Sequence, residues 1–423
     1  MTAPLHVMVV DDTITYRTIV KKVAESIPGV SVQVLNTAVN GQEALDKLKE
    51  QNKPGSPHMV ELVLLDVEMP VLDGLSTLKQ ISRFYPDVTV VMVSAASRTN
   101  AGIIMKCLTA GAMDFVTKPL ESNMERAMNA LRRELAPILG HLATRPNRPS
   151  PTARPRPLRG TSPAPTAGAR QPTAATTRTR GTTTGTTGAR PPPPATPRST
   201  PTPGRTTVPQ ATAKAPPTAA KSTPPKNLAS PPKPELLLIG SSTGGPAALT
   251  QVLGGLMKKE LPIPTLIVQH MPPVFTASLA TQLARSSGLA VSEVQDGQPL
   301  LPGRIYIAMG GRHMTVKKLD QSLVAALHDG AKVNECRPAV DVLFMSVIAS
   351  FQKNILSVIL TGMGRDGGNG VEALKRGGKT WCITQNKATC VVYGMPRTVE
   401  EMGLSDESLP LEQIGPRILQ LCS

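Results

Sequence analysis

The chain has 423 residues and a formal net charge of +16 at pH 7, and this length favours two or three domains. The charge is unevenly spread, because residues 141–234 contain fifteen Lys and Arg residues and no Asp or Glu. The excess charge therefore says little about the folded parts, and we expect no specific nucleic-acid binding by them. No run of about 18 apolar residues occurs, which argues against a membrane-spanning helix.

The cysteines and the N-terminal residues indicate the cellular compartment in which the protein is expected. The five cysteines form no C-x-x-C pair or metal-type cluster, as is typical of proteins in a reducing environment. The first residues lack the basic region and apolar core of a signal peptide. We therefore expect a cytoplasmic protein.

Residues 1–140 alternate the patterns of strands and helices. Strands are expected at 5–10, 32–38, 62–66, 88–94 and 114–117, and helices at 13–27, 42–50, 75–84, 101–110 and 122–139. Five strand–helix units predict a flavodoxin-like α/β domain with a parallel sheet in the strand order 2-1-3-4-5. The domain is expected to span residues 1–125, with its last helix reaching about 140.

Polar side chains stand at the ends of four of these strands. Asp11 and Asp12 follow the first strand, and Asp66 ends its neighbour, the third. Carboxylates at one sheet edge repel one another unless a hard cation joins them, and Mg²⁺ suits such oxygen ligands. Ser94 and Lys118 end the fourth and fifth strands, where they suit phosphoryl oxygens. The plainer alternative is a set of surface carboxylates at strand ends.

Asp66 belongs to a longer run of residues, which is Leu64-Leu65-Asp66-Val67-Glu68-Met69-Pro70-Val71-Leu72-Asp73-Gly74. Together with the other four positions, this run closely resembles response-regulator receiver domains over roughly residues 1–125. The resemblance implies that Asp66 accepts a phosphoryl group and binds Mg²⁺ with Asp11 and Asp12. It also implies that Ser94 and Lys118 contact the phosphate.

Residues 141–234 hold 23 of the 42 prolines of the chain and no aromatic residue. Such a segment cannot bury enough apolar surface to offset the entropy of ordering, so a disordered linker rich in Pro, Thr, Ala and Arg is predicted. Its positive charges suit weak contact with an anionic membrane surface. A tether without any partner is the alternative.

Residues 235–423 return to a globular composition. Strands are expected at 236–239, 266–270 and 355–360, and helices at 247–257, 276–286, 340–352 and 370–376. Between them, the short runs 304–308, 313–318 and 323–327 suggest an antiparallel excursion. The pattern predicts a second doubly wound, mostly parallel α/β domain.

Ser242 lies in Gly240-Ser241-Ser242-Thr243-Gly244, directly after the first of these strands. A G-x-S-x-G turn from strand to helix lifts the serine hydroxyl clear of the sheet, beside free N–H groups that face a developing oxyanion. His270 and Asp366 also follow buried strands, at the edge where open α/β sheets bind ligands. A hydrolase with a Ser-His-Asp triad is therefore the leading hypothesis.

Each of these residues has a plainer interpretation. Ser242 alone suits a turn or a helix N-cap, His270 a strand end, and Asp366 a cap for the helix at 370. Two other function classes also compete: a receiver-containing signalling adaptor without chemistry, and a DNA-binding regulator. No helix-turn-helix pattern supports the regulator.

Longer motifs surround the candidate triad, at residues 239–245, 269–273, 301–303, 337–344, 360–367 and 393–397. In this order they resemble the CheB family of chemotaxis protein-glutamate methylesterases and glutamine deamidases, over residues 235 to about 400. The chain departs from the usual residues of the family at two positions. Ser241 stands at a position that is usually alanine, and Ala339 at one that is often serine.

The resemblance implies that Ser242 attacks the γ-carbonyl of a receptor glutamyl methyl ester, that His270 takes and returns the proton, and that Asp366 orients the imidazole. The backbone N–H groups of Thr243 and Met363 would stabilise the oxyanion, and no cofactor is needed for the ester chemistry. The implied partners are methylated chemoreceptors and a CheA-type histidine kinase as phosphodonor.

Overall fold

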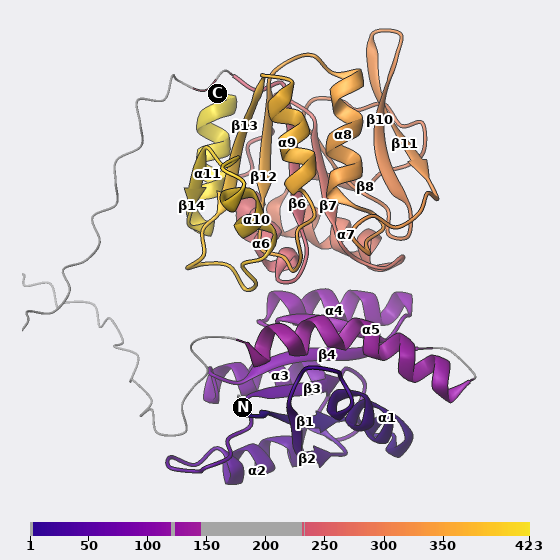
Figure 1. Ribbon diagram of the computed structural model, residues 1–423, viewed down its shortest axis with the longest axis vertical. Coiled ribbons are helices and arrows are strands. Elements are labelled where there is room, and N and C mark those ends of the chain that lie inside the picture. The colour runs from indigo at the N-terminus through magenta and orange to yellow at the C-terminus, as the bar shows by residue number, and fades with distance from the viewer. Residues whose placement is uncertain (1–2, 120–122, 145–230, 232) are drawn as a thin grey trace, which may run out of the picture. The chain divides into compact units, whose positions relative to one another are not determined.

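The structure is a computed structural model that describes residues 3–119, 123–144, 231 and 233–423 (Figure 1). The predicted linker, 141–234, lies outside the described residues except at its two ends. An α/β part flanks it on each side.

The first part contains one parallel sheet of five strands in the order β2-β1-β3-β4-β5. Its strands are β1 (Leu5–Val10), β2 (Val32–Ala38), β3 (Leu62–Asp66), β4 (Thr89–Ala95) and β5 (Asp114–Lys118). Its helices are α1 (Ile14–Glu25), α2 (Gly41–Gln51), α3 (Gly74–Phe84), α4 (Arg98–Thr109) and α5 (Met124–Ala143). The predicted strand order and all ten predicted elements are confirmed, with small shifts at their ends.

Local sequence explains where these elements begin. The strands β1 and β3 are mostly apolar, apart from His6 and Asp66, and they are buried along their whole length, as expected for a parallel sheet covered on both faces. Asn40, Asp73 and Ser97 each accept a hydrogen bond from a backbone N–H of the first turn of the following helix, which is the usual N-cap interaction. Because Ser97 caps α4, this helix begins three residues earlier than the apolar pattern predicts.

The second part contains a parallel sheet of seven strands in the order β14-β13-β12-β6-β7-β9-β8. Its strands are β6 (Leu236–Ser241), β7 (Thr265–Gln269), β8 (Ala290–Glu293), β9 (Arg304–Ile307), β12 (Ile355–Ile359), β13 (Thr380–Gln385) and β14 (Glu407–Leu409). Its helices are α6 (Gly245–Gly254), α7 (Phe275–Ser287), α8 (Val340–Ser350), α9 (Gly368–Arg376), α10 (Met395–Glu401) and α11 (Leu411–Cys422). The strand β6 lies between β12 and β7, which places the carboxyl ends of these three strands side by side.

The predicted antiparallel excursion is smaller than expected. Among the strands of the described residues, only β10 (His313–Leu319) and β11 (Ser322–His328) pair in antiparallel fashion, and α8 packs against β10. The first of the three short runs is β9, which instead pairs in parallel with β7 and β8. A short apolar run indicates a strand but not its direction, and three of the four residues of β9 are buried inside the sheet.

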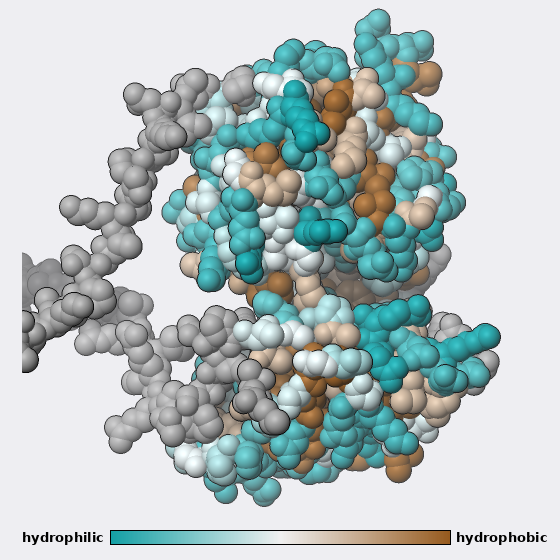
Figure 2. All heavy atoms as spheres, viewed as in Figure 1, coloured by the Kyte–Doolittle hydropathy of each residue, from teal (hydrophilic) through white to brown (hydrophobic). Residues whose placement is uncertain are grey.

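The apolar residues that drive this folding are mostly enclosed. The largest fully buried side chains include Tyr306, Phe275 and Phe344 in the second part and Met8 in the first. The face drawn in Figure 2 is mostly hydrophilic, with small hydrophobic patches. Among the described residues, no helix combines the length and the apolar character that crossing a membrane requires.

Candidate functional site

The turn between β6 and α6 holds Ser242 at the centre of the second sheet. Gly244 has a φ of 76°, in the left-handed region that favours glycine, and it directly precedes the helix. A Cβ on Gly245 would collide with the side chain of Gln269. The N–H of Ser242 donates to the carbonyl of Thr361 (3.1 Å), which ties the turn to the end of β12. These contacts produce the sharp strand-to-helix turn that the sequence predicts.

The two adjacent serines have different surroundings. Ser241 is fully buried, and its hydroxyl donates to Oε1 of Gln269 (2.7 Å). Ser242 is half-buried, and Nε2 of Gln269 donates to its carbonyl (2.9 Å). The hydroxyl of Ser241 is therefore committed to holding Gln269, whereas the hydroxyl of Ser242 makes no hydrogen bond among the described residues.

His270 follows β7, and its N–H donates to the carbonyl of Ser241 (3.1 Å). Its Nε2 lies 2.7 Å from Oδ2 of Asp366, and its Nδ1 lies 3.4 Å from Sγ of Cys336. The structure thus pairs His270 directly with Asp366. In the described residues the hydroxyl of Ser242 makes no hydrogen bond to the imidazole. Nδ1 is the ring nitrogen left to accept a proton, because Nε2 faces the carboxylate.

Asp366 lies on the loop between β12 and α9, and only 1% of its surface is exposed. Besides His270, its carboxylate accepts hydrogen bonds from the backbone N–H groups of Val340 (2.6 Å) and Asp341 (3.1 Å). These are the first residues of α8. The plainer interpretation, that Asp366 caps the next helix along the chain, is therefore wrong: it caps α8 and holds His270.

The site favours a negative Asp366 and a positive His270. Burial alone would raise the pKa of Asp366, but His270 and the two backbone N–H groups outweigh it and lower this pKa below its ordinary value. Burial alone would lower the pKa of His270, but Asp366 and Cys336 outweigh it and raise this pKa to about 10. The pair is therefore arranged to stabilise an imidazolium.

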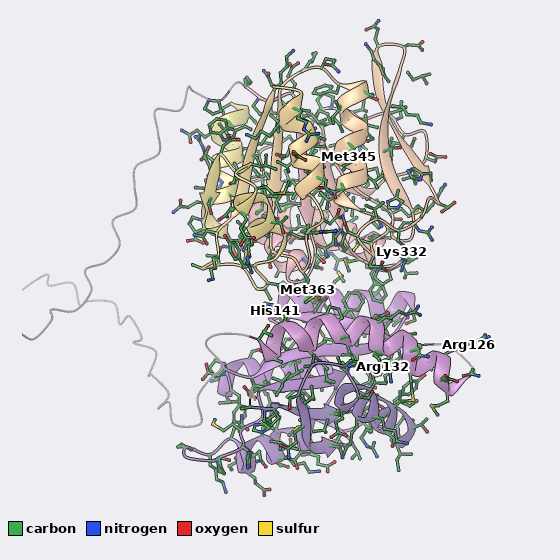
Figure 3. All side chains as sticks on the ribbon, viewed as in Figure 1. Arg126, Arg132, His141, Lys332, Met345 and Met363 are labelled. Carbon is green, nitrogen blue, oxygen red and sulfur yellow. The ribbon has the colours of Figure 1, made fainter. Side chains whose placement is uncertain are left out.

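Two backbone N–H groups near Ser242 are available to an anion. Thr243 directly follows the serine, and Met363 stands on the loop after β12, where Figure 3 labels it. Within the described ranges, neither N–H donates to a protein acceptor. Free N–H groups at a strand-to-helix turn have the chemistry of an oxyanion hole.

Two supporting residues escape prediction from the sequence. Gln269 joins Ser241, Ser242 and His270 through its side-chain amide, and Cys336 contacts His270. Gln269 directly precedes His270 in the motif at residues 269–273, and this position was a sign in the sequence that it supports the site. Cys336 offered none, because the loop that carries it is 66 residues away from His270 in the chain.

The first part of the chain has its own polar site at the carboxyl edge of the sheet. Ligand oxygens of Asp11, Asp12 and Asp66 all lie within 4.8 Å of one another. Lys118 places its Nζ 2.7 Å from both Asp11 and Asp66, and Ser94 is buried at the end of β4. The structure therefore brings together Asp11, Asp12, Asp66 and Lys118, and it places Ser94 on β4, the strand next to β3. A cluster of three carboxylates fits a hard cation such as Mg²⁺.

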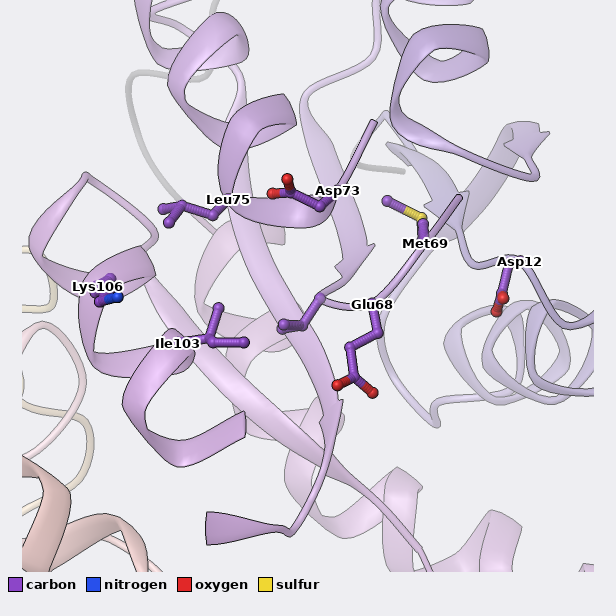
Figure 4. Close-up of a pocket in the computed structure, with 8 residues that line it drawn as sticks. Asp12, Glu68, Met69, Asp73, Leu75, Ile103 and Lys106 are labelled. Atoms are coloured by element: carbon purple, nitrogen blue, oxygen red, sulfur yellow. The ribbon is translucent and has the colours of Figure 1, made fainter. Parts of the chain in front are cut away.

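Burial is the main reason that the pKa of Asp66 rises to about 6; Lys118 opposes this rise, and the nearby Asp11 adds to it. A pocket of about 650 Å³ adjoins the cluster and is drawn in Figure 4. Its lining includes Asp12, Glu68 and Lys106. The acidic cluster thus borders this pocket through Asp12.

Comparisons with known proteins find relatives for both parts of the chain. The CheB methylesterase family model matches residues 237–418, and the response regulator receiver domain model matches residues 7–131. The protein-glutamate methylesterase/protein-glutamine glutaminase of group 2 operon from Bradyrhizobium diazoefficiens is 38% identical over 418 residues, 99% of this chain and 94% of the relative. The protein of the same name from Rhodospirillum centenum is 36% identical over 422 residues, 99% of this chain and 94% of that relative.

Among solved structures, the catalytic domain of CheB methylesterase from Thermotoga maritima is 40% identical. The match covers 44% of this chain and 98% of that chain, with a TM-score of 0.43.

Replacing Cys336 with alanine is expected to lower the pKa of His270, because Cys336 is one of the two side chains that raise it. The measurement is a titration of the His270 ring nitrogens by NMR in the full-length protein. Cys390→Ala serves as the control, since Cys390 is also half-buried but contacts the carbonyl of Gln385 instead. An unchanged or higher pKa of His270 in Cys336→Ala would contradict the expectation.

Proposed function

The chain belongs to the CheB methylesterase family and carries a response regulator receiver domain, and we propose that Ser242, His270 and Asp366 carry out its hydrolytic chemistry. The protein is a protein-glutamate methylesterase and protein-glutamine glutaminase that acts in receptor adaptation. The observation that carries the assignment of residues is the buried His270–Asp366 pair beside the Ser242 turn. This pair argues against an adaptor that has lost its chemistry.

In the first half of the reaction, Oγ of Ser242 attacks the γ-carbonyl of a glutamyl methyl ester and passes its proton to Nδ1 of His270. Asp366, on Nε2, stabilises the imidazolium that forms. The N–H groups of Thr243 and Met363 donate to the oxyanion, and such a donor is typically worth about 3–4 kcal/mol. His270 then protonates the leaving methanol.

In the second half, a water molecule attacks the acyl-enzyme and gives its proton to His270, which returns it to Ser242. The product is a free glutamate side chain. A glutamine side chain follows the same path, with ammonia leaving in place of methanol. The ester chemistry needs no cofactor in this scheme.

The proton transfer requires a small rearrangement. Nδ1 of His270 faces Cys336 in this structure, so the hydroxyl of Ser242 must replace the sulfur as its partner when substrate binds. Catalytic hydrogen bonds are often long or absent without substrate and tighten in the complex. Neutral His270 is the reactive form, so the raised pKa favours activity that increases with pH.

In the receiver domain, Asp66 accepts the phosphoryl group from a CheA-type histidine kinase. Asp11, Asp12 and Asp66 would hold Mg²⁺, which neutralises phosphoryl oxygens when it is bound. Lys118 and Ser94 contact the phosphoryl oxygens, and the position of Lys118 between two carboxylates supports this role. Methylated chemoreceptors are the substrates. The five cysteines are free thiols, which supports a cytoplasmic location.

Ser242→Ala is expected to reduce methanol release from methylated receptor membranes by at least about a thousandfold, because a triad without its nucleophile retains little catalysis. Ser241→Ala should keep most of the activity, since this hydroxyl only supports Gln269. The two variants are matched, as each removes one hydroxyl from neighbouring positions of the same turn. Equal losses in two folded proteins would show that the nucleophile is misassigned.

Asp66→Asn is expected to abolish phosphorylation by acetyl phosphate and, with it, any stimulation of methanol release, while basal activity stays unchanged. Labelling with acetyl phosphate in Mg²⁺ and a methanol assay provide the two readouts. Asp87→Asn is the control, because Asp87 is exposed and precedes β4, at the opposite edge of the sheet. Persistent labelling of Asp66→Asn would assign the phosphoacceptor to another carboxylate.

The fifteen basic residues at 141–234 suggest attraction to an anionic membrane near the receptors, where each charge adds up to about 1 kcal/mol. Replacing most of them with Ser or Gln at constant length should weaken binding to anionic vesicles at low salt. Hydrolysis of a small soluble ester should not change. Identical vesicle binding by both proteins across a salt series would leave this segment as a tether only.

A further inference from the structure

Two buried carboxylates hold the N-termini of two neighbouring helices. Asp366, on the loop before α9, accepts from the first N–H groups of α8, as described above. Asp341, in the first turn of α8, accepts from the N–H groups of Gly367 (2.9 Å) and Gly370 (2.7 Å) at the start of α9. Asp366 therefore caps α8, the helix that carries Asp341, and Asp341 caps α9, the helix that follows Asp366. The helix dipole favours negative charge at both N-termini.

One side chain bridges these two carboxylates. Nδ2 of Asn334 donates to Oδ2 of Asp341 (2.9 Å) and to Oδ1 of Asp366 (2.9 Å). A primary amide nitrogen carries two hydrogens, so it serves both acceptors at once. The pKa of Asp341 is raised above its ordinary value. Burial is the largest cause, and repulsion by the nearby carboxylate of Asp366 is the second. The amide of Asn334 offsets part of that repulsion.

The backbone around Asn334 keeps its side chain in place. Val333 and Cys336 exchange two backbone hydrogen bonds (3.1 and 2.9 Å) and close a tight turn. Within this turn Asn334 and Glu335 have φ values of 50° and 62°, and asparagine tolerates this left-handed region better than most residues. Nε2 of the buried His313 hydrogen-bonds to the carbonyl of Ala331 (2.9 Å), next to Lys332, which Figure 3 labels. The chain just before the turn is thus anchored to β10.

We propose that Asn334 is a positioning residue for the hydrolysis, holding Oδ1 of Asp366 so that Oδ2 remains directed at Nε2 of His270. The four donors of Asp366 divide evenly between its oxygens: Asn334 and Asp341 bind Oδ1, and His270 and Val340 bind Oδ2. Without the amide, the carboxylate can rotate and the imidazole loses its fixed orientation. This inference rests on the proposed roles of His270 and Asp366.

The competing explanation is that Asn334 matters only as a turn former. Asn334→Gly separates the two, because glycine favours a positive φ but has no amide. Asn334→Asp keeps a similar shape, but an ionised carboxylate cannot donate and adds a third negative charge. Glu335→Gly is the matched control: it changes the adjacent positive-φ position, whose side chain is exposed.

The experiment measures kcat and KM for a small methyl ester, together with the melting temperature, in the full-length variants. Asn334→Gly and Asn334→Asp should lose about 10- to 100-fold in kcat, the range for small misplacements of a catalytic group. Their KM should change by less than about threefold, and Glu335→Gly should stay within about twofold of the parent in both constants.

Three results would overturn the proposal: an unchanged kcat in Asn334→Gly, an equal loss in Glu335→Gly, or a loss of folding in both Asn334 variants, which would make the residue a turn former. Ser242→Ala run in parallel tests the proposed function separately. If Ser242→Ala keeps its activity, the triad itself is wrong. If only Ser242→Ala is inactive, the triad stands and the role of Asn334 fails.

Discussion

The enclosed negative charge of Asp366 organises the catalytic domain. Burying a carboxylate is costly unless donors satisfy it, and here each oxygen has two. The donors come from the end of β7, the start of α8 and the turn at Asn334. His270 and the stretch that runs from Asn334 to the start of α8 are far apart in the chain, and they meet at Asp366. The orientation of His270, and with it the chemistry of Ser242, depends on that meeting.

The same sheet geometry produces both sites, but with opposite electrostatic results. In each domain, neighbouring parallel strands deliver polar side chains to one carboxyl edge. Asp66 shares its surroundings with a second carboxylate and one ammonium group, so burial prevails and its pKa rises. Asp366 faces an imidazole and the start of a helix, which overcome burial and lower its pKa. The first arrangement suits a cation and a phosphoryl group, and the second suits an imidazolium.

Close packing around Ser242 explains why small residues surround it. A Cβ on Gly362 would lie 2.8 Å from Cβ of Ser242, and one on Gly240 would lie 2.7 Å from a methyl of Val340. Gly240 therefore serves the packing of α8 against the sheet, while Gly244 provides the positive φ of the turn. Serine fits at position 241, where the family usually has alanine, because Oε1 of Gln269 accepts a hydrogen bond from its hydroxyl. These contacts leave little space for larger residues around the turn.

The sequence by itself determined the two α/β folds, the order of the first sheet and the residues at the strand ends, because apolar periodicity and glycine spacing are local properties. It did not determine the direction of β9, the hydrogen bonds of Ser241, the helix that Asp366 caps, or the contacts of Asn334 and Cys336. These depend on which strands become neighbours and on which loops reach the sheet edge. Asn334 lies 32 residues from Asp366, and Cys336 lies 66 residues from His270. Only tertiary packing brings such pairs within hydrogen-bonding distance, because no local pattern encodes the partner of a loop side chain.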